Sequence, residues 1–116
     1  MFVPLVEEGL TKGPITKLIV ESYLSHFKNT DVDTLILGCT HYPILTAVIK
    51  EVVGKNISLV DSRKATADVV MEVLNKNGLF SDDSIGGVYS FVTDSKESFQ
   101  KVITKALTPE INISIK

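Results

Sequence analysis

The chain has a single cysteine and no long apolar run, and both absences narrow what it can be. One cysteine excludes an internal disulfide and a zinc site built from several cysteines, so we expect no metal and a reducing, cytoplasmic location. No apolar stretch is long enough to span a bilayer. Because Met1 leads straight into Phe2-Val3-Pro4, without a basic and then a long apolar segment, no signal peptide is expected either.

An excess of either positive or negative charge is also missing. The 116 residues include 12 basic and 14 acidic ones, which leave a net charge of -2, and neither sign forms a long run. This balance does not suit a nucleic-acid backbone. Glycine patterns that cradle phosphates are absent as well, since Gly86-Gly87 precedes a predicted strand rather than a helix. With 44% hydrophobic and 22% charged residues, the chain is typical of a globular protein that can bury a core.

The apolar spacing predicts helices that alternate with strands. After a short apolar piece at residues 2–6, Gly13-Pro14 opens a helix. Its predicted buried face consists of Ile15, Leu18, Ile19, Tyr23 and Phe27. An uninterrupted apolar run at residues 35–37, ended by Gly38, is typical of a parallel strand covered on both faces. A second helix should carry Pro43 in its first turn and end at Gly54. Its predicted buried stripe is Ile44, Leu45, Val48, Ile49, Val52 and Val53.

The second half of the chain repeats this alternation. Residues 57–60 predict a strand, and Ser62 can cap a helix that ends at Asn77-Gly78 and buries Val69, Val70, Val73 and Leu74. A polar loop at residues 81–84 precedes a strand at residues 87–92. Asp94 with Glu97 predicts a capping box for a helix that carries Phe99, Val102, Ile103 and Leu107. The alternating tail, with Ile111, Ile113 and Ile115, predicts an edge strand. The whole pattern predicts an α/β fold with a mainly parallel sheet and alternating helices.

Active groups of parallel α/β proteins gather where strands end and helices begin, and residues 38–43 occupy such a place. A thiol at Cys39, just before a helix start, would feel the positive end of the helix dipole, which favours the thiolate. His41 is close enough to exchange protons, and the Thr40 hydroxyl could contact a carboxylate or amine. The residues by themselves leave other interpretations open, because a lone cysteine is more often a small buried apolar residue. Glu7 and Glu8 fit solvated charges, and Asp61-Ser62 fits a helix cap.

The run Leu-Ile-Leu-Gly-Cys-Thr-His-Tyr-Pro-Ile-Leu at residues 35–45 resembles the second-cysteine motif of glutamate racemases. Racemases of the same superfamily that act on aspartate usually have glutamate where this chain has His41, so the histidine favours glutamate. Further segments are similar to the family: Phe-Val-Pro-Leu-Val-Glu-Glu-Gly at residues 2–9, Val60-Asp61-Ser62, Ala65-Thr66-Ala67 and Phe-Val-Thr-Asp at residues 91–94. The resemblance covers essentially the whole chain.

The resemblance implies a cofactor-independent isomerase that makes D-glutamate for cell-wall peptidoglycan. In the family, one cysteine thiolate removes the α-proton of glutamate and a second cysteine returns a proton to the opposite face. By position, Cys39 corresponds to the second cysteine and Thr40 to a substrate-contacting residue. His41 corresponds to the assisting acid or base, and Glu7, which directly follows Pro4-Leu5-Val6, to the acid that orients the histidine.

This chain lacks the family's first cysteine and the amino-terminal half that carries it. Family members have two similar α/β lobes, and by that pattern residues 1–60 belong to the lobe with the second cysteine and residues 61–116 to the returning part of the other lobe. The expected partners are therefore glutamate and an amino-terminal half. Two alternatives stay open: a non-catalytic α/β fragment that self-associates, for example as a homodimer, or a related amino-acid racemase.

Overall fold

The computed structural model describes residues 1–82, 86–93, 95–106 and 113–115. Within these ranges helices and short strands alternate along the chain, as the apolar spacing predicted. The elements are α1 (Phe2–Glu7), α2 (Pro14–Leu24), the 3-10 helix η1 (Ser25–Asn29), β1 (Thr34–Ile36), the 3-10 helix η2 (Tyr42–Leu45), α3 (Thr46–Val53), β2 (Ser58–Val60), α4 (Ser62–Lys76), β3 (Val88–Ser90), α5 (Lys96–Ala106) and β4 (Ile113–Ile115).

The described strands form two separate parallel pairs. In the first, β1 pairs with β2 so that Leu35 lies opposite Leu59, and in the second, β3 pairs with β4 so that Tyr89 lies opposite Ser114. Parallel strands need a crossover, and α3 and α5 supply it in the two units. The predicted α/β class with parallel pairing is therefore confirmed. Asp94, Leu107 and Ile111, along with residues 83 and 84 of the predicted polar loop, lie outside the described residues.

The core lies within the first half of the chain. Helix α3 packs its apolar stripe against α2, while η2, which begins the stripe, packs against α1; the predicted stripe is confirmed, with Ile44 on its margin. The buried apolar residues are Phe2, Leu5, Val6, Val20, Leu37, Leu45, Val48, Ile49, Val52, Val53 and Ile57. Gly54, with a φ of 94°, ends the helix in a conformation that favours glycine. No described residue after Ile57 is buried.

Pro43 begins a 3-10 turn rather than the first turn of an α-helix, which corrects the predicted start. The His41 carbonyl accepts a hydrogen bond from the Ile44 N–H at 3.1 Å, which is an i to i+3 bond. The Thr46 hydroxyl donates to the Pro43 carbonyl at 2.7 Å. These bonds occupy the early carbonyls, so the α-helical pattern of α3 begins only at Thr46.

The predicted face of α2 is wrong in part. Ile15 and Leu18 are 60% and 65% exposed, whereas Thr16 and Val20 are fully buried. Burial of Thr16 is tolerated because its hydroxyl can donate to the carbonyls of Leu10 and Lys12, at 3.0 and 3.2 Å. Of the predicted residues, Ile19 and Phe27 do pack against the core, while Tyr23 is half exposed.

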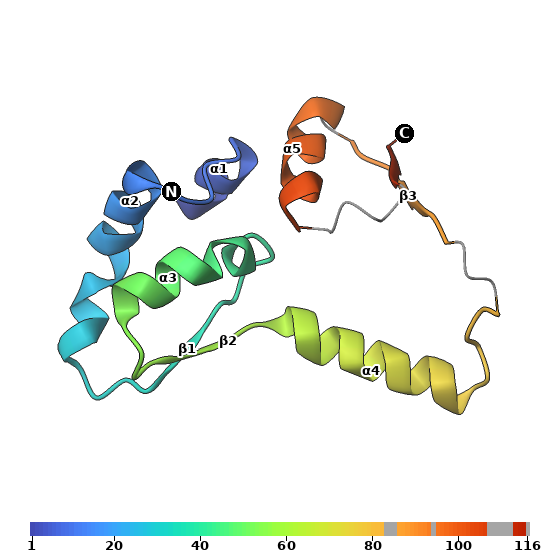
Figure 1. Cartoon of the computed structure of the whole chain (residues 1–116), viewed down its shortest axis with the longest axis horizontal. Coiled ribbons are helices and arrows are strands. Elements are labelled where there is room, and N and C mark those ends of the chain that lie inside the picture. Colours follow the sequence, from blue (N-terminus) through green and yellow to red (C-terminus); the bar gives the residue numbers. More distant parts are fainter. Residues whose placement is uncertain (83–85, 94, 107–112, 116) are drawn as a thin grey trace.

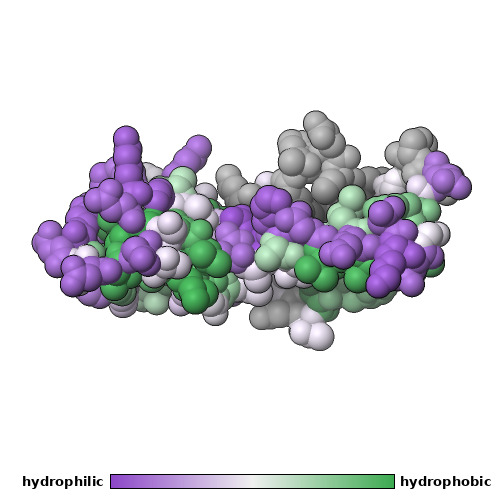
Figure 2. Space-filling view, turned by 90° about the horizontal axis from the view of Figure 1, so that it is seen from below, coloured by the Kyte–Doolittle hydropathy of each residue, from purple (hydrophilic) through white to green (hydrophobic). Residues whose placement is uncertain are grey.

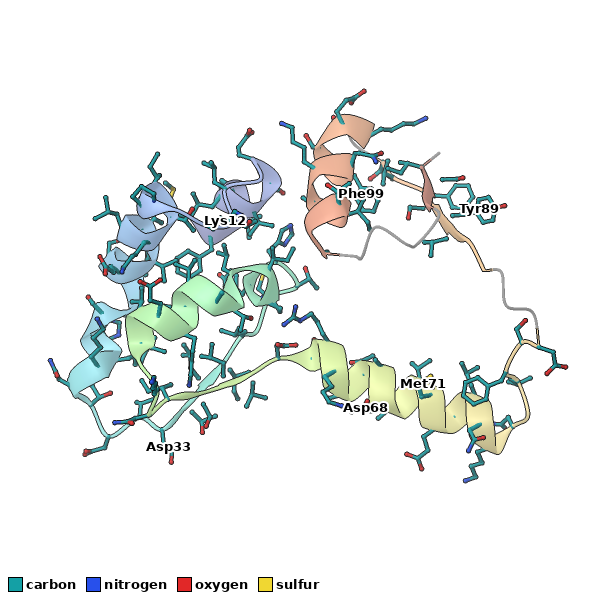
Figure 3. All side chains as sticks on the ribbon, in the orientation of Figure 1. Lys12, Asp33, Asp68, Met71, Tyr89 and Phe99 are labelled. Carbon is teal, nitrogen blue, oxygen red and sulfur yellow. The ribbon has the colours of Figure 1, made fainter. Side chains whose placement is uncertain are left out.

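Helix α4 does not bury its predicted apolar face. Val69, Val70 and Val73 are about half exposed, and Figure 3 shows side chains such as those of Asp68 and Met71 standing out from a helix with no other helix beside it. The cap residue is Asp61 rather than Ser62, because the Asp61 carboxylate accepts from the Arg63 N–H at 2.9 Å. Hydrogen bonds from Arg63 also hold the pKa of Asp61 below its usual value.

The β1–β2 pair is covered on one face rather than on both. Ile36 is 74% exposed and Val60 48% exposed, while Leu35 and Leu59 lie half-buried against the core. Figure 2 shows this as apolar surface over the part that carries the two strands and again toward α4, between polar side chains. The missing cover, like the bare face of α4, leaves apolar surface that a longer protein could bury.

The chain follows an open path. Helix α4 leads away from residues 1–60, and α5 returns to lie near α1 (Figure 1). The radius of gyration is 17.0 Å, against about 13 Å for a compact domain of similar length. Val102 packs against the core and Lys101 pairs with Glu8, and these contacts help to hold α5 near α1. Among the described helices, none is both long and apolar enough to cross a membrane.

Replacing a buried leucine should destabilise the chain far more than replacing an exposed one. Leu45 is fully buried and Leu18 is 65% exposed. We expect Leu45→Ala to lower the free energy of unfolding by about 2–5 kcal/mol, and Leu18→Ala to leave it nearly unchanged. Urea unfolding followed by circular dichroism measures both. Equal losses in the two variants would contradict this location of the core.

Candidate active site

The segment that follows β1 lies at the carboxyl edge of the β1–β2 pair, where the sequence predicted the site. The chain leaves β1 at Ile36, and the Leu37 N–H donates to the Val60 carbonyl at 2.8 Å. Leu37 is buried, which anchors the segment to the core. Gly38, Cys39 and Thr40 then bring the chain to His41, directly before η2. Both ends of this segment are thus held, one by the sheet and one by the 3-10 turn.

His41 lies between the other three predicted site residues. Its Nδ1 atom is 3.9 Å from the Cys39 sulfur and 3.4 Å from the Thr40 hydroxyl oxygen. Its Nε2 atom is 3.9 Å from Oε1 of Glu7, which comes from α1. One ring nitrogen therefore faces the thiol and the other faces a carboxylate. The thiol, the imidazole and the carboxylate form a row that can pass a proton along it.

The distances describe a loosely assembled row. At 3.9 Å, the contact between His41 and Glu7 is too long for a hydrogen bond, and it is an ion pair only when the imidazole is protonated. The side chains of His41 and Glu7 are 28% and 51% exposed, and Cys39 is half-buried. Catalytic hydrogen bonds are often long without substrate and shorten when it binds. Small movements of two side chains would close this row.

The structure also separates two adjacent carboxylates. Glu7 faces His41, whereas Oε2 of Glu8 lies 3.7 Å from Nζ of Lys101 in α5. The choice of Glu7 as the residue next to the histidine rested on resemblance alone. The geometry now distinguishes the two carboxylates. Glu7 lies next to the His41 imidazole, whereas Glu8 contacts a lysine of α5.

The helix dipole contributes less at Cys39 than the sequence predicted. The first α-helical residue of α3 is Thr46, seven positions after Cys39, and η2 lies between them. A dipole acts mainly within the first turn of its helix, and a short 3-10 turn has few aligned peptides. The His41 ring is closer to the thiol than the α3 helix is, and a protonated ring would stabilise a thiolate.

A cavity of about 520 Å³ adjoins the row on the His41 side. Glu7, Thr40, His41 and Ile44 line one wall. The opposite wall consists of Phe91, Val92, Thr93, Ser95, Ser98, Phe99, Val102 and Ala106, from the end of the β3 segment and from α5; Figure 3 shows Phe99 on that helix. Of the residues that the structure describes, neither Cys39 nor any lysine or arginine lines the cavity. With Glu7 in its wall, this cavity is poorly suited to an anion.

Sequence reasoning missed the α5 wall. The apolar spacing of Phe99 and Val102 predicted a helix with a buried face, but contained no sign of which partner the face meets. These residues follow His41 by more than fifty positions, and only the fold brings them opposite it. Among the residues that the structure describes, no three His, Cys, Asp or Glu side chains gather into a group that could hold a metal ion.

No family model matches the chain, but individual proteins do. It is 43% identical to a glutamate racemase of Chlorobaculum parvum over 103 residues, which are 88% of this chain and 38% of that protein. The solved glutamate racemase of Thermus thermophilus, in complex with beta-chloro-D-alanine, matches with a TM-score of 0.75 at 33% identity, over 99% of this chain and 44% of the other. The glutamate racemase of Francisella tularensis, in complex with D-glutamate, matches with a TM-score of 0.76 at 29% identity, over 99% and 43%.

These matches confirm the predicted resemblance to glutamate racemases and the α/β fold that goes with it. The chain spans about two fifths of the length of the racemases that it matches. The motif at residues 35–45 was therefore a reliable guide to relatives.

The geometry predicts that His41 promotes the reactivity of Cys39. With the imidazole removed by His41→Ala, we expect iodoacetamide to alkylate Cys39 about two- to tenfold more slowly at neutral pH, because the thiol loses the neighbouring imidazole that can accept its proton. The rate is measured by mass spectrometry of the modified chain. His26→Ala is the matched control, since the His26 ring lies against Phe27 in η1, whereas the ring beside the thiol is that of His41. Equal rates in all three proteins would exclude an effect of His41.

Proposed function

We propose that this chain is part of a glutamate racemase and that it supplies one of the two thiols that exchange the α-proton of glutamate. The observation that carries this proposal is the position of His41, with Cys39 at one ring nitrogen and Glu7 at the other. That arrangement suits a thiol that must repeatedly lose and regain a proton. The similarity to proteins named glutamate racemase supports the choice of reaction.

In the proposed reaction, one thiolate takes the α-proton, so the C–H bond breaks and an S–H bond forms. A second thiol on the opposite face then donates its proton to the carbanion, which inverts the centre. Cys39 serves one face. His41 can take up the proton of Cys39 and return it, while Glu7 stabilises the imidazolium and holds the ring in place. Residues of this chain form no covalent bond to the substrate, and the family reaction that the resemblance implies uses no cofactor.

We propose glutamate as the substrate and place it on the Cys39 side of the row. The cavity on the other side of His41 contains the Glu7 carboxylate and no cationic side chain, so it would repel a dicarboxylate. The Thr40 hydroxyl, beside both Cys39 and His41, is a suitable donor to a substrate carboxylate. The Francisella tularensis racemase in complex with D-glutamate supports this ligand class. The D-glutamate formed in the proposed reaction would serve peptidoglycan synthesis in the cytoplasm.

The second thiol must come from another polypeptide segment, because Cys39 is the sole cysteine of this chain. We propose that it belongs to an amino-terminal portion. Residues 1–60 would then form part of the lobe with Cys39, and residues 61–116 part of the other lobe. The position of the core supports this division, since the buried apolar residues within the described ranges lie between Phe2 and Ile57. The exposed face of α4 would pack against the added portion.

A second candidate applies to the chain without that portion: self-association, for example as a homodimer. The half-exposed valines of α4 favour it, together with Ile36 on the open face of β1. Apolar patches of this kind drive association when nothing covers them. Light scattering of the purified chain would detect it.

We predict that the chain alone does not racemise glutamate at an enzyme-like rate. Inversion by two groups needs a second thiol across the α-carbon, and His41 approaches from nearly the same place as Cys39. Adding a separately expressed amino-terminal portion should restore activity, to give what we call the complemented protein. Circular dichroism or chiral chromatography of L-glutamate follows the conversion.

Two variants make this test decisive. Cys39→Ser in the complemented protein should abolish racemisation, while the conservative surface change Lys28→Arg should not alter it. Activity of the chain alone that disappears with Cys39→Ser would show that the second thiol is not needed.

We predict that Glu7 acts through His41. In the complemented protein, His41→Ala should slow one direction of racemisation more than the other, because each thiol serves one face. Adding Glu7→Gln to His41→Ala should then cost little more, since residues that work as one unit are not additive. Single-turnover rates from each enantiomer provide the measurement. Fully additive losses would mean that Glu7 acts independently.

A further inference from the structure

The carboxyl end of α1 has an electrostatic problem that the helix itself does not solve. Glu7 is its last residue and Glu8 its cap, and both carboxylates stand at the negative end of the helix dipole. No basic residue lies in the last turn of α1. Both side chains are more than half exposed, so each carboxylate could change its rotamer. Some cation from elsewhere in the fold has to offset this concentration of negative charge.

Lys101 is the cation that the fold supplies. Its Nζ atom lies 3.7 Å from Oε2 of Glu8, and its helix α5 lies against α1. The ion pair is exposed and would be weak by itself. However, Val102, the next residue, packs against the core, so the backbone that carries Lys101 is fixed there by apolar contact. The backbone position of Lys101 is therefore defined, and only the lysine side chain must become ordered to form the ion pair.

We propose that Lys101 is a positioning residue for the thiol, imidazole and carboxylate row. By pairing with Glu8 it keeps that carboxylate away from His41 and leaves Glu7 as the acid that faces the imidazole. Without Lys101, the two adjacent carboxylates compete for the same ring nitrogen, and Glu7 is held less often in the useful position. Lys101 does not touch substrate. This inference rests on the proposed function, because it assigns Lys101 a purpose in that reaction.

Helix α5 also lines the cavity beside His41. Ser98, Phe99 and Val102 form the wall opposite His41, and Lys101 lies on the same helix. The helix thus faces the row across the cavity and pairs with Glu8, the chain neighbour of Glu7. Residues far from Cys39 in the sequence thereby influence which acid supports His41.

The test uses the complemented protein and compares Lys101→Ala with Lys96→Ala, which removes the same charge from the same helix. We expect Lys101→Ala to slow racemisation about two- to fivefold, a size typical of an exposed ion pair. The loss should be larger in the direction that His41→Ala impairs more. Lys96→Ala should stay at the unmodified rate, and Lys101→Arg should retain the rate because it keeps the cation.

Rescue separates positioning from a general structural effect. Adding Glu8→Gln to Lys101→Ala should restore the rate, because the competing carboxylate is gone. If Lys101 only held α5 in place, the double variant would remain as slow as Lys101→Ala. Persistence of the loss in the double variant, or equal losses in Lys101→Ala and Lys96→Ala, would overturn the proposal.

A readout that does not depend on activity keeps the two proposals distinguishable. The ring nitrogen signals of His41, recorded by NMR of the ¹⁵N-labelled protein, should shift in Lys101→Ala, return with Glu8→Gln and stay unchanged in Lys96→Ala. An unmodified complemented protein without racemase activity would contradict the proposed function. Unchanged His41 signals in Lys101→Ala would overturn the role of Lys101, whatever the activity.

Discussion

Burial of the α3 stripe is the constraint on which the rest of the structure depends. Leu45, Ile49 and Val52 are fully buried, with α3 packed against α2 and η2 packed against α1, and this packing sets where these elements lie. Glu7 stands at the end of α1 and His41 directly before η2, so the distance between them follows from the packing of α1 against η2. The site thus inherits its geometry from the core, with few hydrogen bonds of its own.

The second half of the chain has no comparable core. Described residues after Ile57 are at most half-buried, and α4 leaves its valines in solvent. An ordinary compact chain of this length would bury these faces. The solved relatives have more than twice the length of this chain, and a longer polypeptide offers surfaces to cover them. The open path is thus a consequence of too few partners for the apolar faces present.

Proton transfer in the proposed site depends on charge as well as on distance. Of the adjacent carboxylates Glu7 and Glu8, Glu7 belongs to the row, and Glu8 pairs with Lys101 of α5. Residues of the same helix also form a wall of the cavity beside His41. Both features come from the return of the chain to α1. Residues 1–60 therefore do not determine the geometry of the proposed site by themselves.

Local spacing was enough to predict the elements and the reactive segment. The run that ends at Gly38 indicated a strand, and Cys39, Thr40 and His41 lie close together because they are neighbours in the chain. The α3 stripe was also predictable, since its period is helical and every apolar residue in it has a partner within this chain. Glu7 was identified only by resemblance to the family, because thirty-four positions separate it from His41 and no local rule spans that interval.

Only the tertiary structure decided which faces are covered. Apolar periodicity shows that a helix has a face to bury, but it contains no information about the surface that meets it. For that reason it placed Ile15 and Leu18 on the buried face of α2, where Thr16 is buried instead because its hydroxyl finds two carbonyls. It also predicted burial for α4 valines that are about half exposed. The pairing of Glu8 with Lys101 and the α5 wall opposite His41 were equally out of reach. Each joins residues far apart in the sequence, and such contacts exist only once the chain has folded back on itself.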